Sequence, residues 1–111
     1  MTRGVLMSRL AQVAVGIGAG TLVYTAPSQF HADVRDILIA NTSATSIRFT
    51  LHLVPPSDTP SAGNVIFPSV VVPANTLIQW TGDQTIQPGG FLQAIGTALG
   101  ITVTVNGEVA R

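Results

Sequence analysis

The chain has 111 residues, of which 46% are hydrophobic and only 9% are charged, and its formal net charge is zero. Because an average protein carries about 25% charged residues, this composition excludes a basic footprint for nucleic acid, and the lack of cysteine excludes a disulfide scaffold and thiolate metal sites. The length suffices for one domain, and an apolar, weakly charged surface favours a subunit of an assembly over a free monomer.

The N-terminal stretch RLAQVAVGIGAG, residues 9–20, is open to several interpretations. Arg9 and Gln12 interrupt its apolar run, so it is too short for the roughly 20 apolar residues of a membrane span and is a poor secretory signal. Its glycines are spaced G-x-G-x-G rather than the G-x-G-x-x-G of a dinucleotide loop. Alternation of apolar residues instead predicts a strand over 9–17, then a glycine bend and a second strand over 21–25.

Two neighbouring segments show the period of two that is typical of half-buried strands. In DVRDILIANTS, Ile37 and Ile39 share one face, and a polar turn follows at 41–43. SIRFTLHL then places four apolar residues on one face: Ile47, Phe49, Leu51 and Leu53. We therefore predict a hairpin over residues 33–53. A helix capped by Ser28 is the weaker alternative for the start of this region.

The next part of the chain combines β-branched residues with turn-forming residues. LVPPSDTPSAGN, residues 53–64, has no periodicity and predicts an exposed loop. Because proline cannot donate to a strand ladder, Pro68 and Pro73 mark strand ends. TGDQTIQPGG, residues 81–90, predicts a turn region. Between these breaks we predict three short strands: 64–67, 69–72 and 76–81.

The C-terminal part predicts two further strands. FLQAIGTALG is a strand over 91–97 rather than a helix, because Gly96 and Gly100 disfavour helical structure. ITVTVNGEV alternates strictly over 101–105, and Asn106-Gly107 then signals a tight turn.

Many short strands separated by turn signals predict an all-β fold. We expect an antiparallel β-sandwich, jelly-roll-like, that forms a single domain over residues 9–111. Residues 1–8 would precede it as an N-terminal arm, and Met7 offers an alternative start of the chain.

Residue types that carry chemistry are sparse. His31 and Asp33 would share a strand face, but a metal site needs more ligands than these two. Arg35 and Asp36 are adjacent and should face opposite ways. Nothing resembles a nucleophile elbow, so no catalytic, cofactor-binding or metal-binding residue is predicted. The single Tyr24 and Trp80 are expected as core or interface anchors rather than as a glycan platform.

The candidate contact residues come from the arm, from the arginines and from the proline-rich loop. Every basic residue of the chain is an arginine, whose planar fork suits interfaces. We predict the following interface candidates: Arg3, Leu6, Arg9, Arg35, Arg48, Pro55, Pro56, Asp58 and Pro60.

The order of these segments resembles a family of small structural proteins of tailed bacteriophages. The resemblance runs through TLVYTAPSQFHADVRDILIANTSATSIRFTLHLVP, VVVPANTLIQWTGDQTIQPGGFLQA and GITVTVNGEV, and it covers about residues 9–109. One departure is the turn after Tyr-Thr, where the family has Pro-Ala-Gly and this chain has PSQFH, residues 27–31.

The resemblance implies a non-enzymatic virion protein with a β-sandwich fold and no cofactor. A capsid decoration, or cement, subunit would bridge copies of the major capsid protein as a homo-oligomer, with a trimer plausible by analogy. It would bind neither nucleic acid nor membrane, and would join the virion in the cytoplasm of the bacterial host. The alternative is a tail, head-fibre-base or baseplate module for host attachment; a soluble enzyme is a third, unsupported class.

Overall fold

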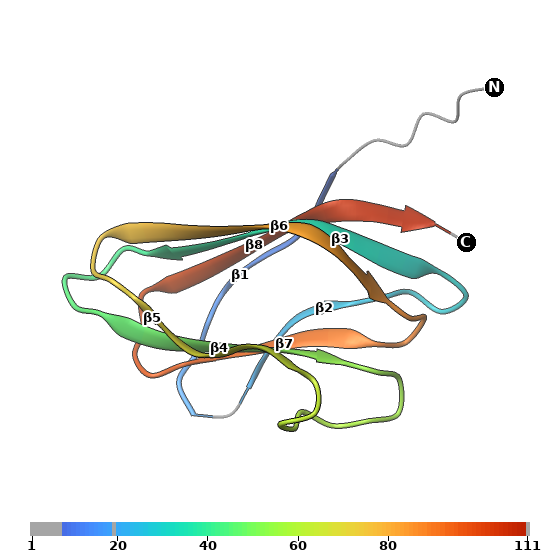
Figure 1. Cartoon of the computed structure of the whole chain (residues 1–111), viewed down its shortest axis with the longest axis horizontal. Coiled ribbons are helices and arrows are strands. Elements are labelled where there is room, and N and C mark those ends of the chain that lie inside the picture. Colours follow the sequence, from blue (N-terminus) through green and yellow to red (C-terminus); the bar gives the residue numbers. More distant parts are fainter. Residues whose placement is uncertain (1–7, 19, 111) are drawn as a thin grey trace.

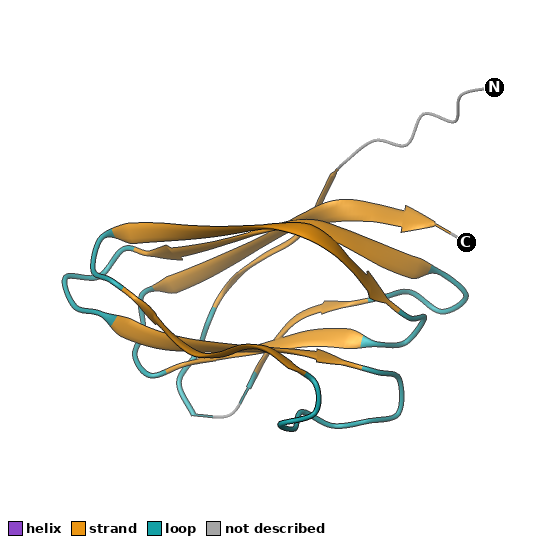
Figure 2. Cartoon of the chain, in the orientation of Figure 1, coloured by secondary structure: helices purple, strands orange, loops and turns teal. Residues whose placement is uncertain are grey.

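The computed structural model describes residues 8–18 and 20–110, and these form eight strands with no helix (Figures 1 and 2). The strands are β1 (Ser8–Ala14), β2 (Thr21–Thr25), β3 (His31–Asn41), β4 (Ile47–Val54), β5 (Val65–Val72), β6 (Thr76–Ile86), β7 (Phe91–Gly96) and β8 (Ile101–Ala110). Ser8, which we expected in the arm, is the first residue of β1 and lies opposite Gly107 of β8.

The strands form two layers that lie face to face (Figure 1). One sheet has the order β1-β8-β3-β6, called sheet A below, and the other has the order β2-β7-β4-β5, called sheet B. Every neighbouring pair of strands is antiparallel. The pairings nest, since β1 pairs with β8, β2 with β7, β3 with β6 and β4 with β5. This is the topology of a jelly roll, so the predicted antiparallel, jelly-roll-like β-sandwich is confirmed.

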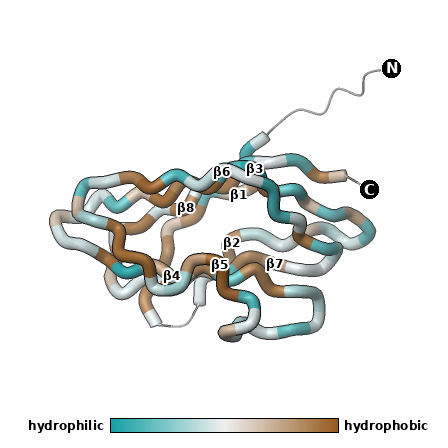
Figure 3. Tube along the Cα trace, in the orientation of Figure 1, coloured by the Kyte–Doolittle hydropathy of each residue, from teal (hydrophilic) through white to brown (hydrophobic). Residues whose placement is uncertain are grey.

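The core lies between the sheets and follows the predicted alternation. The side chains of Ile37, Ile39, Ile47, Phe49 and Leu51 are at most 1% exposed. Buried and more exposed positions alternate along most of β4 and along β3 on each side of its bulge, so each strand buries one face and presents the other to solvent. Figure 3 shows hydrophobic residues recurring along both layers. The rings of Phe49 and Phe67 meet edge to face with centroids 6.1 Å apart, which joins neighbouring strands of sheet B.

A β-bulge in β3 changes which face its side chains occupy. Val34 pairs with Gly107 and Asp36 with Asn106, so Arg35 is an extra residue in the ladder. Because the bulge shifts the alternation by one position, Arg35 and Asp36 both contact residues of the outer face. The expectation that they face opposite ways is therefore wrong.

The predicted hairpin over 33–53 is also wrong. Both strands exist, but β3 belongs to sheet A and β4 to sheet B, so the turn between them crosses from one layer to the other. Alternation shows that each strand has one buried face, and it carries no information about whether two such strands pair or stack.

Asn41, the one buried polar side chain in the described part of the chain, holds this crossing in place. Its amide nitrogen lies 2.9 Å from the Thr45 carbonyl oxygen, 3.0 Å from that of Val72 and 3.2 Å from that of Pro73. Its Oδ1 accepts from the backbone N–H of Ser43 at 2.9 Å. One side chain thus ties the β3–β4 turn to the β5–β6 turn.

Asn41→Ala should lower the free energy of unfolding by about 2 kcal/mol, because it removes the donor to the buried Val72 carbonyl oxygen and to the Pro73 carbonyl oxygen. Urea denaturation measures the loss. The neighbouring Thr42→Ala, at an exposed position, is the control and should stay within about 0.5 kcal/mol of the parent. Equal stability of the two variants would contradict the role given to Asn41.

Four predicted strand boundaries require correction. The first strand ends at Ala14, and Ile17 forms only an isolated parallel bridge and is 57% exposed. Pro68 lies within β5 rather than between two strands. This is possible because β5 is an edge strand and bulges at Ser69, which has a φ of 49°. β6 runs on to Ile86, beyond the predicted end at 81, so the turn region shrinks to 87–90.

The fourth correction concerns Asn106-Gly107, which is no turn. β8 continues through both residues to Ala110, opposite the bulge of β3. Glycine is needed at 107 because an added Cβ would overlap the carbonyl oxygen of Asp33. The predicted strand over 91–97, observed as Phe91–Gly96, is confirmed in preference to a helix.

Candidate functional site

One end of the sandwich, called the loop end below, brings the candidate contact elements together. It comprises the loops 26–30, 55–64 and 87–90 with the end of β8 (Figure 1). The start of β1 lies further in, opposite Gly107 of β8. The first and third loops are joined by two backbone hydrogen bonds, at 2.9 Å and 3.1 Å, between Ala26 and residues 89–90. An added Cβ on Gly89 would lie 3.5 Å from the Cβ of Pro56, so loop 55–64 lies against the same cluster.

Loop 55–64 is built around Asn64 at its base. The Asn64 Oδ1 accepts from the Ser61 N–H at 3.0 Å and lies 2.9 Å from the Nδ1 of His52. Its amide nitrogen donates to the Thr59 carbonyl at 2.9 Å. The four candidate residues of the loop are all exposed: Pro55, Pro56, Asp58 and Pro60. A loop whose base is fixed and whose prolines are exposed loses little entropy when it binds.

Asn64→Ala should therefore loosen the loop while the sandwich survives. We expect a loss of about 1 kcal/mol in the free energy of unfolding, since partly exposed hydrogen bonds contribute that much, and faster cleavage within residues 55–64 by a non-specific protease. Limited proteolysis followed by mass spectrometry locates the cut. Thr104→Ala, on the outer face of sheet A, should leave the cleavage rate unchanged, and faster cleavage in that control would argue against the role of Asn64.

The arginines do not form one surface. Arg3 and Leu6 lie outside the described residues. Arg9 is on the outer face of sheet A, where it donates to Gln12 at 3.3 Å, and Arg48 is on the outer face of sheet B, where it donates to the Ser69 carbonyl at 3.0 Å. Arg48 thus stabilises the bulge of β5 within the chain. The sequence alone predicts it only as an interface candidate.

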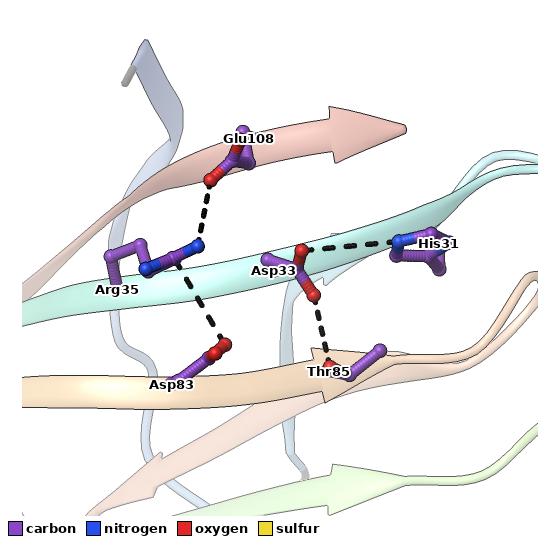
Figure 4. A network of polar contacts seen from close by, with 6 residues as sticks. All are labelled: His31, Asp33, Arg35, Asp83, Thr85 and Glu108. Atoms are coloured by element: carbon purple, nitrogen blue, oxygen red, sulfur yellow. Dashed lines mark hydrogen bonds and ion pairs between the residues drawn. The ribbon is translucent and has the colours of Figure 1, made fainter. Parts of the chain in front are cut away.

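Arg35 belongs to a polar network on the outer face of sheet A (Figure 4). Its Nη2 lies 3.1 Å from the Glu108 carboxylate, and its Nε lies 3.9 Å from that of Asp83. This Nε is buried and has no hydrogen-bond partner. The guanidinium is therefore held by two carboxylates from the flanking strands, in the cross-strand pairing expected of residues on neighbouring strands.

A second branch of this network joins β3 to β6. Thr85 donates to the Asp33 carboxylate at 2.9 Å, and the His31 Nε2 lies 3.8 Å from the other oxygen of that carboxylate. His31 and Asp33 thus share a face, as predicted. No group of three or more histidine, cysteine, aspartate and glutamate side chains gathers around a possible metal position within residues 8–18 and 20–110.

The outer face of sheet A is the acidic surface of the molecule. Four of its carboxylates come from three strands: Asp33, Asp36, Asp83 and Glu108. Asp36 accepts from Gln79 at 3.1 Å and from Asn106 at 3.0 Å. The zero net charge of the chain therefore conceals an uneven distribution, with more carboxylates than arginines on this face.

The two single aromatic residues pack against the core rather than forming a binding platform. Tyr24 and Trp80 are partly buried and contact the core cluster, in agreement with their predicted role as anchors. Partial burial raises the pKa of Tyr24 above its usual value of 10.0. Across the described ranges, no helix is long and apolar enough to cross a lipid bilayer.

Sequence reasoning found the loop but missed the residues that organise it. His52 was not among the candidate contact residues, and Asn64 entered only as the last residue of the predicted loop 53–64. A weak signal was present, because asparagine at the end of a turn-rich segment commonly bonds to nearby backbone. The bulge that places Arg35 and Asp36 together left no such signal.

The comparisons with known proteins assign no family. The chain matches no model of a known protein family, and no curated protein matches it at a significant level.

Proposed function

We propose that this chain is a non-enzymatic structural protein of a tailed-phage virion, and that it acts as a capsid decoration subunit. The observation that carries the proposal is the loop end of the jelly roll, where the exposed loop 55–64 is pre-formed around Asn64. Jelly rolls are common in viral capsid proteins, and the order of strands and turns resembles small phage structural proteins.

In this role the sandwich is a rigid support and the loop end is the contact surface. The exposed prolines of loop 55–64 would lie against the major capsid protein, and residues 1–7 would contact a neighbouring subunit. A specific interface buries about 800 Å² on each partner. The subunit would then bridge adjacent capsid proteins and hold them together.

The test is binding of the purified protein to capsids that lack it, measured by co-sedimentation. We expect the parent to bind and two variants to bind at least about tenfold more weakly: a chain without residues 1–7, which leaves β1 intact, and the double variant Pro55→Ser, Pro60→Ser. The matched control is Pro73→Ser, which changes an exposed proline at the opposite end of the sandwich.

Binding of both variants at the parental level would overturn the proposed contact surface. The number of copies per virion, from quantitative mass spectrometry, tests the location. Decoration requires copies in proportion to the capsid subunits, whereas a few copies per particle would point to the tail, head-fibre base or baseplate.

A further inference from the structure

The outer edge of β6 has no partner in the described part of the chain. β6 is the last strand of sheet A and pairs only with β3. The backbone hydrogen bonds that lie outside strand pairs involve no residue of 76–86. Because alternate residues of an edge strand direct their N–H and C=O groups away from the neighbouring strand, this edge offers a row of donors and acceptors to another strand.

The other three edges of the sandwich carry features that discourage strand addition. β5 is interrupted by Pro68 and by Ser69, whose φ is 49°. β2 has only 5 residues and a register shift after Leu22. β1 has a register shift between Arg9 and Ala11, beside a charged side chain.

The first half of β6 carries none of these features. Thr76–Thr81 pairs with Asp36–Asn41 without any register shift, and it contains no proline, glycine or charged residue. Leu77 is 55% exposed there. The second half differs, since it bulges at residues 82–83, and a pairing centred there would bring Asp83 close to its own copy.

We propose that the Thr76–Thr81 edge pairs with the same edge of a second copy of this chain. Antiparallel pairing of one segment with itself is two-fold symmetric, so each free donor meets a free acceptor of the other copy. It joins two four-stranded sheets into one continuous sheet. This inference concerns the isolated protein and does not depend on the virion role.

The segment also fixes the register. With Gln79 on the two-fold axis, Ile78 lies opposite Trp80 of the second copy, and Leu77 opposite Thr81. This arrangement places the partly buried Ile78 and Trp80 side by side on the face that continues the core, and it covers the exposed Leu77. A strip about 20 Å long is much smaller than a standard interface of about 800 Å² per partner, so the dimer is weak and covalent trapping is the suitable measurement.

The lack of cysteine makes trapping specific, because any introduced thiol is unique. In Gln79→Cys the two thiols face each other across the axis, where opposing Cα atoms are about 4.5–5.5 Å apart, within the range of about 4.4–6.8 Å for disulfides. We expect a disulfide-linked dimer to form at least about tenfold faster than in Leu22→Cys, since pairing raises the effective concentration of the thiols.

Leu22→Cys and Leu77→Cys are matched controls. Leu22 is 57% exposed, also on an edge strand, and Leu77 is 55% exposed on β6 itself. In the proposed register the two copies of position 77 are about 14 Å apart, so Leu77→Cys alone should react slowly. A mixture of Leu77→Cys and Thr81→Cys should form a mixed disulfide rapidly, and adding Leu77→Lys to Gln79→Cys should slow its cross-linking.

Unchanged circular dichroism and thermal midpoints establish that each variant is folded. If Gln79→Cys cross-links no faster than Leu22→Cys, the edge pairing is overturned. If Leu77→Cys alone is fastest, the register is overturned. Because all measurements use the purified protein, failure of capsid binding with successful cross-linking would count against the virion role alone.

Discussion

Replacing Phe49 with alanine should lower the free energy of unfolding by about 3–5 kcal/mol, the range measured for buried aromatic residues. Phe49 is 0% exposed and is the largest of the fully buried side chains in the described part of the chain. Its loss leaves a cavity between the sheets and removes the edge-to-face contact with Phe67. Because domains are stable by only about 5–15 kcal/mol, this loss removes a large fraction of the stability of the fold.

Urea denaturation of Phe49→Ala beside Leu99→Ala measures this effect. Leu99 is 66% exposed, so its truncation should change the free energy of unfolding by no more than about 0.5 kcal/mol. A double-mutant cycle with Phe67→Ala isolates the ring contact, for which we expect a coupling of about 0.5–1.5 kcal/mol. A loss below about 1 kcal/mol for Phe49→Ala would contradict the burial described above.

Gly107→Ala should destabilise the protein by about 3 kcal/mol, at the upper end of the usual cost of overpacking. The added methyl group would meet the backbone carbonyl of Asp33, which cannot rotate away as a side chain could. Relief requires β3 and β8 to separate at the bulge, in the middle of sheet A. Thermal unfolding followed by circular dichroism measures the loss.

Gly63→Ala is the matched control for Gly107→Ala. An added Cβ at position 63 lies 3.6 Å from the Ser61 Oγ, an ordinary contact in an exposed loop. Its effect should stay within about 1 kcal/mol of the parent. Equal midpoints for the two alanine variants would show that the close approach of β8 to β3 does not constrain the fold.

The strands were predictable wherever one face is buried. Ile101 and Val103 in β8 alternate with threonines and are buried as expected. Ile37 and Ile39 in β3 are also buried as expected, with the partly exposed Leu38 between them. This pattern requires only that each strand has one buried face, so it is the same for any order of the strands in the sheets.

Long-range pairing determined what the sequence could not predict. Asn106-Gly107 is a residue pair typical of turns. It is nevertheless extended, because β3 pairs with these two residues and with the residues of β8 before and after them. Proline is typical of strand ends, yet Pro68 lies within β5. It is tolerated because β5 is an edge strand, so no neighbouring strand needs a hydrogen bond from the N–H that proline lacks. In each case the local preference was outweighed by a partner strand distant in the sequence.

In the candidate site, too, some features were predictable from local composition and others depended on distant strands. The exposure of Pro55, Pro56 and Pro60 followed from local composition. The roles of the two arginines depend on neighbouring strands. Arg48 stabilises the bulge of β5, and Arg35 bridges Glu108 and Asp83. Those neighbours are known only once the topology is known.

The nesting of the jelly roll also has a kinetic consequence. β1 pairs with β8, and Gln12 donates to Thr104, a residue 92 positions away along the chain. Because β1 precedes β8 in the chain, it has no strand partner during synthesis until β8 has been made. Folds dominated by such distant pairings close large loops before they gain contacts, and they fold on timescales of about milliseconds to seconds. In refolding of the purified protein we expect β1 to be among the last strands to become protected from hydrogen exchange.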